Sequence, residues 1–279
     1  MTTPGVNPDT KRDHRINTTG CGEQNDGLSK RTSHHILVSS RYNALFCYVP
    51  KVASGNWKSV FLVLEGHFNT TKINRSIVHH VRLLDALRRH SRSEVVRMLQ
   101  TFKKIAFVRE PMERIVSAYQ NKFAQDYEGR TYHHKYGKSI IMKYRKHFTG
   151  EVTDEHYTKF NEFVQYLIDL TPNESRNEHW ERQHKLCSPC VINYDFIGKY
   201  DTLKSDAARA LELMGASDVI TFPEKRKKPL EGLDTKALMK TYFSMISEEK
   251  FLQLRHAYDE DYEIFGLHKP TYLEVIGSV

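Results

Sequence analysis

Two segments of the chain share one order of apolar and polar positions, which predicts strand, loop and helix in turn. In the first, residues 44–49 form a short apolar run typical of a buried strand, and Pro50 ends it. Gly66 is the stop signal of the helix that follows. Apolar residues recur at helical spacing in that helix, at Trp57, Val60, Phe61 and Leu64.

The second segment begins with a helix start signal. Ser91 and Glu94 have the spacing of a capping box, in which each side chain accepts a hydrogen bond from the backbone of the other residue. Residues 104–108 then predict a second buried strand, and Pro111 suits the first turn of another helix. That helix has an apolar stripe at Ile115, Val116, Tyr119 and Phe123.

The rest of the chain continues the alternation. Residues 191–197 predict a third strand, whereas the polar residues 126–158 predict no clear element beyond a short helix. Strands that alternate with helices indicate an α/β fold with a central parallel sheet flanked by helices. Further helices are predicted over residues 160–170, 203–214, 235–245 and 248–258.

The pattern predicts one folded domain behind a polar N-terminal segment. Residues 1–40 are polar and have no apolar period, so we expect a flexible arm or stem there. Residues 41–279 show no internal repeat or second boundary and are expected to fold as a single domain. A bilayer span needs about 18 consecutive apolar residues, and a signal peptide needs an apolar core. Neither occurs, so we expect no membrane span in this chain.

The net charge adds a preference for an anionic partner. The 279 residues have a formal charge of +8, which suits a nucleotide, nucleic acid, an acidic glycan or a membrane surface. The same charge is also compatible with an ordinary solvated surface. One concentrated stretch is a candidate contact for a polyanion and consists of Lys225, Arg226, Lys227 and Lys228.

The glycosylation sequons and the cysteines indicate in which cellular compartment the protein folds. Asn-x-Ser/Thr triplets at Asn17, Asn69, Asn74 and Asn173 are weak evidence for a secretory history. Cys187 and Cys190 form a C-x-x-C pair, which fits a disulfide, half a metal site or a redox pair. A zinc site needs a second pair of ligands, and Cys21 and Cys47 have no close Cys or His partner. We therefore favour structural disulfides or buried thiols.

The loop between the first strand and its helix has the features of a phosphate site. Backbone N–H groups at the start of a helix attract anions, and small residues let an anion approach them. Residues 50–58 place small residues there, with Lys51 as a mobile positive charge. The Walker sequence is absent, so an ATPase or GTPase is not indicated. An ordinary strand-to-helix loop with a surface lysine is the alternative interpretation.

A second such loop follows the next strand. Arg109 lies at the C-terminal end of that strand, where open parallel sheets bind ligands. Ser117 is two helical turns further on, and an arginine fork and a hydroxyl can reach one phosphate together. A local salt network of Glu110, Glu113 and Arg114 is the alternative. Two anion-suited strand ends in one sheet are a stronger signal than either alone.

These motifs resemble those of Golgi carbohydrate sulfotransferases. Residues 50–58 are similar to the 5'-phosphosulfate loop of that family, and residues 109–119, REPMERIVSAY, to its 3'-phosphate element. The similar branch contains chondroitin and dermatan 4-O-sulfotransferases and the glucuronyl 3-O-sulfotransferase. The resemblance covers residues 42–270, with Ser54 where the branch usually has Cys and Gly55 where it has Ser or Thr. Further agreement lies at residues 178–180, 186–190, 194–199 and 261–266.

The resemblance implies a P-loop-like sulfotransferase fold and a reaction. A sulfonate would pass from 3'-phosphoadenosine 5'-phosphosulfate (PAPS) to a sugar hydroxyl, such as a GalNAc 4-O position of chondroitin or dermatan, in the Golgi lumen. No metal would be needed. Lys51 would stabilise the leaving 5'-phosphate, while Arg109 and Ser117 would hold the 3'-phosphate. The backbone of the first loop would bind the 5'-phosphate, through Val52, Ala53, Ser54, Gly55, Asn56 and Trp57.

The reaction also needs a base for the proton of the acceptor hydroxyl, and histidine suits neutral pH. The resemblance places a histidine between the two motifs, where this chain has His79 and His80. If Val78 and Val81 face the core, only one of the pair points into the cleft, and we favour His80. Glu110 is the next candidate.

Two other classes of protein compete with this interpretation. A P-loop kinase-like enzyme would need a Walker lysine-serine pair and a carboxylate for magnesium, and neither can be placed. A non-enzymatic module that binds glycosaminoglycans or nucleic acid would account for the charge, but not for two strand–loop–helix anion sites.

Overall fold

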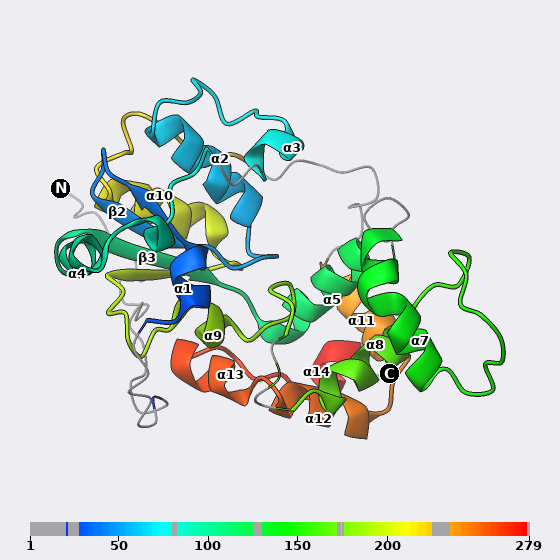
Figure 1. Ribbon diagram of the computed structural model, residues 1–279. Coiled ribbons are helices and arrows are strands. Elements are labelled where there is room, and N and C mark those ends of the chain that lie inside the picture. The colour runs from blue at the N-terminus through cyan, green and yellow to red at the C-terminus, as the bar shows by residue number, and fades with distance from the viewer. Residues whose placement is uncertain are drawn as a thin grey trace, which may run out of the picture.

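The structure is a computed structural model that describes residues 21, 28–79, 83–124, 130–171, 174, 176–224 and 235–277. In this part of the chain, one sheet has four strands in the order β1-β2-β3-β4 (Figure 1). Strands β2, β3 and β4 run parallel, and β1 pairs antiparallel with β2 at one edge. Their bounds are β1 (Ile36–Ser39), β2 (Ala44–Cys47), β3 (Lys103–Val108) and β4 (Phe196–Lys199).

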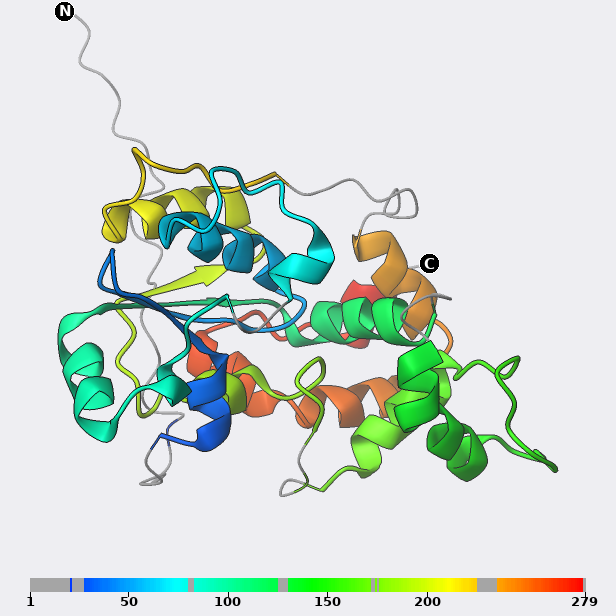
Figure 2. The ribbon, with the colours of Figure 1, turned by 45° about the horizontal axis from the view of Figure 1, so that its top comes forward.

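Helices cover both faces of this sheet. Figure 2 shows α2 (Ser54–Leu64) and α10 (Leu203–Leu213) on one face, with α1 (Lys30–His35) and α9 (Gln183–Cys187) on the other. Each parallel connection therefore passes through helical segments, as an α/β fold requires. The remaining helices before β3 are α3 (Arg75–Val78), η2 (Leu87–Arg89) and α4 (Arg92–Thr101).

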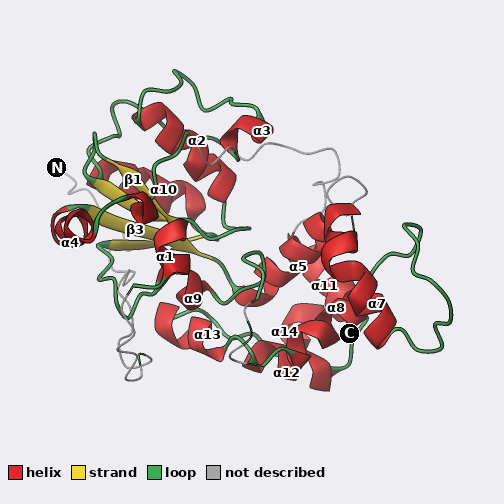
Figure 3. Ribbon diagram, in the orientation of Figure 1, coloured by secondary structure: helices red, strands yellow, loops and turns green. Residues whose placement is uncertain are grey.

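A second group of helices lies beside the sheet (Figure 3). It starts with α5 (Pro111–Lys122), which leaves β3 with Pro111 in its first turn and the side chain of Glu110 as its cap. The other members are the π-helical turn η3 (His133–Gly137), α7 (Lys138–Tyr144), α8 (Phe160–Asp169), α11 (Thr235–Phe243), α12 (Glu248–His256), α13 (Asp259–Phe265) and α14 (Tyr272–Ile276).

Aromatic rings fill the core around the sheet. Trp57 of α2 stacks on Phe46 of β2 with ring centroids 4.7 Å apart, and its ring lies 5.0 Å from that of Phe107 of β3. Gly198 of β4 meets the same Phe107 ring, and a Cβ at Gly198 would come within 2.3 Å of it. Glycine is therefore required at this position of β4 for close packing.

A separate apolar cluster holds the second group of helices together. Its centre is Trp180, which is fully buried. The rings of Tyr136, Phe163 and Phe123 surround it, with centroids 5.1, 5.5 and 5.9 Å away. Because Trp180 precedes α9, this cluster fixes the loop that leads back to the sheet.

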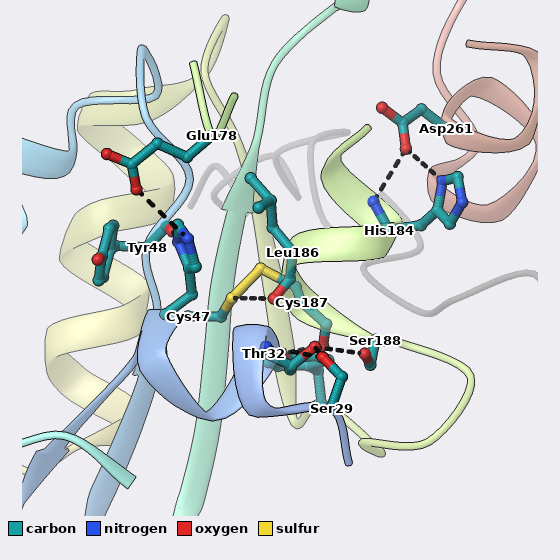
Figure 4. Close-up of a disulfide and its surroundings, with 12 residues drawn as sticks. Ser29, Thr32, Cys47, Tyr48, Glu178, His184, Leu186, Cys187, Ser188 and Asp261 are labelled. Atoms are coloured by element: carbon teal, nitrogen blue, oxygen red, sulfur yellow. Dashed lines mark hydrogen bonds and ion pairs between the residues drawn. A yellow bond between two sulfur atoms is a disulfide. The ribbon is translucent and has the colours of Figure 1, made fainter. Parts of the chain in front are cut away.

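Two disulfides tie distant segments to α9 and the turn after it. Cys47, the last residue of β2, bonds to Cys187 at the end of α9 (Figure 4). Cys21 bonds to Cys190. Both cysteines of the C-x-x-C pair are therefore in disulfides, each with a distant partner. This outcome agrees with the preference for structural disulfides over a metal site.

The predicted α/β class, with a mostly parallel sheet flanked by helices, is confirmed. Two expectations about its edges were wrong. Residues 30–39, assigned to the N-terminal arm, form α1 and β1, so the folded part begins before the predicted boundary at residue 40. The third parallel strand was predicted over residues 191–197 but occupies Phe196–Lys199. Among the described helices, none combines the length and apolar character that crossing a bilayer requires.

Candidate active site

Three parallel strands end at the same edge of the sheet and bring the two predicted motifs together. Arg109 follows β3 directly, and Tyr200 follows β4. The Nη1 of Arg109 donates to the backbone oxygen of Lys51 at 3.2 Å, which joins the second motif to the first. The guanidinium also lies over the ring of Tyr200, 4.1 Å from its centroid. This contact brings Lys51 and Arg109 together at one edge of the sheet, while their roles in nucleotide binding stay predictions.

The turn between β2 and α2 has an unusual backbone. Lys51 has φ 70° and Ala53 has φ 52°, so two non-glycine residues adopt left-handed conformations within three consecutive positions. Such conformations cost free energy and are concentrated at functional sites. Ala53 precedes the first turn of α2 and supplies no side-chain cap. The N-terminal amides of this 11-residue helix are thus directed outward without a capping side chain.

Two of the six loop residues predicted to bind the 5'-phosphate through their backbone use their amides within the protein. The amide of Val52 donates to Val49 O at 3.2 Å, and the amide of Trp57 donates to Ala53 O at 3.1 Å. Both side chains are buried in the core. Of the predicted loop residues, Val52 and Trp57 therefore shape the turn, and an anion would meet the amides of Ala53, Ser54, Gly55 and Asn56.

The ammonium of Lys51 points to α5. Its Nζ donates to Oδ1 of Asn121 at 3.0 Å. The next residue, Lys122, is buried and lies with its Nζ 4.4 Å from the ring centroid of Tyr132. The C-terminal half of α5 therefore gathers two cations near the turn after β2.

Arg109 is held from several sides and is only 5% exposed. Its Nε donates to Glu113 Oε2 at 3.1 Å. The side-chain amide of Gln183 accepts from the Arg109 N–H at 2.9 Å and donates to its carbonyl at 2.7 Å. Ser117, four residues beyond Glu113 on α5, lies on the same helical face and is half-buried.

Glu110 is a helix cap. Its carboxylate accepts from the amides of Met112 at 2.9 Å and Glu113 at 2.6 Å, and from the hydroxyl of Tyr262. Burial raises the pKa of Glu110 to about 7, although these three hydrogen bonds lower it. Because its oxygens are engaged in capping α5, the structure gives Glu110 a structural role in place of the proposed one as reserve base.

Arg114 proves to be a clamp inside the site and is fully buried. Its Nε donates to Pro50 O at 2.9 Å, its Nη2 to Glu178 O at 2.7 Å, and its Nη1 to Glu181 O at 2.6 Å. The alternative of a local salt network with Glu110 and Glu113 is therefore wrong for Arg114. One planar guanidinium fixes the residue before Lys51 against the loop that carries residues 178–181.

That loop brings in a histidine that the sequence marked only as part of the resemblance. His179 has its Nδ1 2.8 Å from Asn177 Oδ1 and 3.2 Å from the hydroxyl of Tyr132. His79 is one of the charged groups that lower the pKa of His179, after burial and the charges of Lys122, Lys51 and Arg114. His79 itself is exposed after α3, while His80 and Val81 lie outside the described residues. Val78 is buried, as expected.

Comparison with known proteins supports the resemblance. A profile described as the sulfotransferase family matches residues 34–268. Carbohydrate sulfotransferase 11 of Mus musculus is 39% identical over 254 residues, which are 89% of this chain and 71% of that protein. Carbohydrate sulfotransferase 14 of Danio rerio is 38% identical, over 90% of this chain and 69% of that protein. Carbohydrate sulfotransferase 8 of Mus musculus is 36% identical, over 92% and 63%.

No solved structure matches the chain significantly. The family match and the identities over most of the chain confirm the expected enzyme class and exclude the non-enzymatic binding module as the best interpretation. The chain therefore belongs to the sulfotransferase family, and the relatives that it resembles there are carbohydrate sulfotransferases.

Proposed function

We propose that this enzyme transfers a sulfonate group from PAPS to a sugar hydroxyl. The observation that carries the proposal is the contact between Lys51 and Arg109 beside the uncapped start of α2. A nucleotide with phosphates at both its 5' and 3' positions needs two anion sites a short distance apart. The ends of the adjacent parallel strands β2 and β3 would supply two such sites at one edge of the sheet.

The donor would lie across these two strand ends. The amides of Ala53, Ser54, Gly55 and Asn56 would bind the 5'-phosphate at the start of α2. Arg109 would pair with the 3'-phosphate, assisted by the hydroxyl of Ser117. Tyr200 stacks on Arg109 and would keep its guanidinium in place while the nucleotide exchanges.

The reaction would be an in-line displacement at sulfur. The acceptor oxygen forms a bond to sulfur as the bond from sulfur to the 5'-phosphate oxygen breaks, and the phosphate oxygen keeps the electron pair. Lys51 would stabilise that growing charge, as positioned cations do in phosphoryl transfer. The acceptor hydroxyl must also lose a proton, for which His79 and His80 remain sequence candidates and His179 is a third.

The acceptor is proposed to be a GalNAc 4-O position of chondroitin or dermatan. The resemblance to the 4-O-sulfotransferase branch and the charge of +8 support this choice. The basic stretch that we propose as a contact for the polymer lies outside the described residues and comprises Lys225, Arg226, Lys227 and Lys228.

The proposed compartment is the Golgi lumen. Two disulfides, Cys21–Cys190 and Cys47–Cys187, require an oxidising environment to form and persist. Two of the four sequons, Asn69 and Asn74, are exposed on the segment between α2 and α3. Both features fit the lumen of the secretory pathway.

Calorimetric titration with 3',5'-adenosine bisphosphate tests the donor site. Replacement of Arg109 by Ala removes the partner of the 3'-phosphate, so binding should weaken by about 30- to 1000-fold, or roughly 2–4 kcal/mol. Arg92, exposed at the start of α4, provides the matched control, and Arg92→Ala should bind like wild type. A folded Arg109→Ala protein with unchanged affinity would contradict the assignment. Wild-type protein that does not bind the nucleotide would overturn the proposed donor.

A further inference from the structure

The backbone around His179 is fixed directly against the turn that carries Lys51. The adjacent N–H groups of Arg114, Nε and Nη2, donate to Pro50 O and Glu178 O at 2.9 and 2.7 Å. Two carbonyls that share one planar guanidinium are held within a few ångströms of each other. Lys51 follows the first carbonyl and His179 follows the second, so Arg114 sets the spacing between these two residues.

A chain of hydrogen bonds also fixes the protonation pattern of the imidazole. Asn177 Nδ2 donates to the hydroxyl of Tyr136 at 3.0 Å, which turns Oδ1 of Asn177 toward His179. That oxygen lies 2.8 Å from His179 Nδ1 and also accepts from the His179 amide at 3.0 Å. An amide oxygen can only accept, so Nδ1 carries the hydrogen and donates it. The lone pair is therefore on Nε2.

The unprotonated nitrogen is available to a ligand. The side chain of His179 is 15% exposed, and its Nε2 makes no hydrogen bond to any residue in the described ranges. Charged groups from several elements act on the ring: Lys122 and Arg114 of α5, Lys51 after β2, His79 after α3 and the adjacent Glu178. Burial first, and then Lys122 and Lys51, lower the pKa of His179 to about 2. The imidazole is therefore neutral at physiological pH.

We propose that His179 is the catalytic base and that Asn177 is its positioning residue. This inference rests on the proposed sulfonate transfer. Nε2 of His179 takes the proton of the acceptor hydroxyl as its oxygen bonds to sulfur, while the bond from sulfur to the 5'-phosphate oxygen breaks. The phosphate leaves with the electron pair beside Lys51. The imidazolium then releases the proton to solvent, and Asn177 keeps Nδ1 as the donor throughout.

The anionic donor matters for this role. A sulfonate and two phosphates bring several negative charges next to Lys51, Lys122 and Arg114, so they offset the cations that suppress protonation of His179. The basicity of Nε2 then rises only when the donor is in place. The site thus has little proton affinity when empty and gains it in the complex in which the acceptor reacts.

Transfer of ³⁵S from labelled PAPS to unsulfated chondroitin tests the base. His179→Ala should lower kcat by about 10²- to 10⁴-fold and leave the affinity for 3',5'-adenosine bisphosphate within about threefold, because the ring does not bind the nucleotide. The exposed His67 offers a matched control, and His67→Ala should retain wild-type turnover. Added imidazole should raise the kcat of His179→Gly at least tenfold. A purely structural role of the side chain would not allow such rescue.

The pH profile provides an independent test that keeps the side chain in place. In Asn177→Asp, a carboxylate replaces the amide beside Nδ1 and raises the basicity of His179. The acidic limb of kcat should then lie at least one pH unit higher than in wild type. The inference would be overturned if the acidic limbs of Asn177→Asp and wild type coincide, or if His179→Ala keeps normal turnover. It would also be overturned if turnover is lost only in His79→Ala or His80→Ala. Inactive wild-type enzyme on chondroitin and dermatan would instead count against the proposed function.

Discussion

Two arginines five positions apart on one segment have different tasks. Arg109 lies at a strand end with Lys51 and Tyr200, in the place where an open parallel sheet binds ligands. The side chain of Arg114 is buried, and its N–H groups donate hydrogen bonds to three backbone carbonyls. Sequence alone gives both the same charge, and only burial separates the ligand candidate from the structural clamp.

Replacement of Arg114 by Lys should destabilise the protein although the charge is kept. An ammonium cannot reproduce a planar fork that serves three carbonyls in fixed directions. Buried acceptors left without a donor cost free energy, so the free energy of unfolding should fall by roughly 2–4 kcal/mol. Urea denaturation measures the change. Arg92→Lys, at an exposed position, should stay within about 0.5 kcal/mol of wild type, and an equally small effect at Arg114 would refute the clamp.

Replacement of Gly55 by Ser should strengthen nucleotide binding. A Cβ at this position meets no heavy atom within 4 Å, so Ser can be accommodated. Its hydroxyl would supply the group that the similar branch usually has there, and we expect affinity for 3',5'-adenosine bisphosphate to rise by about three- to tenfold, or roughly 1 kcal/mol. Gly55→Ala is the matched control, because it adds the Cβ without the hydroxyl. Equal affinities of the two variants would show that the hydroxyl contributes nothing.

At the scale of elements, local signals were reliable where the residues themselves determine the structure. The capping box of Ser91 and Glu94 opens α4, and Pro111 opens α5, both as predicted. Strand β1 was missed because its apolar run, Ile36 to Val38, is short and preceded by polar residues. It becomes a strand through its pairing with β2, where Ile36 faces Cys47. That partner is not visible in the local pattern.

The position of β4 and the helices after α5 depended on contacts between distant residues. Residues 191–195 form a turn and not the predicted strand, because Cys187 and Cys190 just before them are held in disulfides with distant cysteines. Asp195 Oδ2 also accepts a hydrogen bond from the amide of Lys104 at 2.8 Å. The polar segment 126–158 gains η3 and α7 because Tyr132, Tyr136 and Ile140 pack in the cluster around Trp180. Burial of a few aromatic rings outweighs the polar composition there.

Part of the candidate site could be predicted from local sequence, and part depends on contacts between distant residues. Lys51 and Arg109 could be predicted, since each follows an apolar strand and parallel strands end at one edge. His179 could not be placed beside Lys51 from the sequence, because Arg114 and the cluster around Trp180 create that proximity. The signal available in advance was the Glu178-His179-Trp180 triplet in the family resemblance.

The two disulfides should differ in their contribution to stability. They close loops with sequence separations of 140 and 169 residues, which predict nearly equal entropic effects, within about 0.2 kcal/mol. Cys47 and Cys187 are both fully buried, however, whereas Cys190 is exposed. Removal of Cys47 and Cys187 also leaves a void beside β2, so it should cost more.

Paired Cys→Ala variants measure this difference in urea without reductant. Each pair should lower the free energy of unfolding by about 2–5 kcal/mol, with the larger loss for Cys47 and Cys187. The Cys21 and Cys190 variant is the matched control for loop closure. A larger loss in that control would refute the argument from burial.

At the scale of the molecule, a buried ion pair joins α9 to α13. His184 of α9 packs against the sheet side, and its Nδ1 lies 2.7 Å from Asp261 Oδ1 of α13 (Figure 4). Its Nε2 lies 3.2 Å from Glu260 Oε2, at ion-pair distance but without hydrogen-bond geometry. Asp261 also accepts from the amides of Gln183 and His184, so one carboxylate caps α9 and holds its histidine.

This pair predicts a loss of stability at alkaline pH. Although burial lowers the pKa of His184, the hydrogen bond and charge of Asp261 and the charge of Glu260 outweigh it and raise the pKa from 6.5 to about 9. A raised pKa means that the folded protein holds the proton more tightly. The stabilisation is therefore complete below pH 6.5 and is lost as pH rises through about 9, by roughly 3 kcal/mol.

Urea denaturation of wild type and His184→Gln across pH 6 to 10 isolates this contribution. The difference in free energy of unfolding between the two proteins should shrink as pH rises through about 9, because neutral His184 loses its attraction to Asp261 and Glu260. Burial raises the pKa of Glu110 from 4.5 to about 7, which lies inside this pH range, but both proteins contain Glu110, so its effect cancels in the comparison. His256 pairs with Asp259 at 2.7 Å but is 84% exposed, so His256→Gln should show no such pH-dependent difference. A difference for His184→Gln that stays constant with pH would mean that the proton is not what joins α9 to α13.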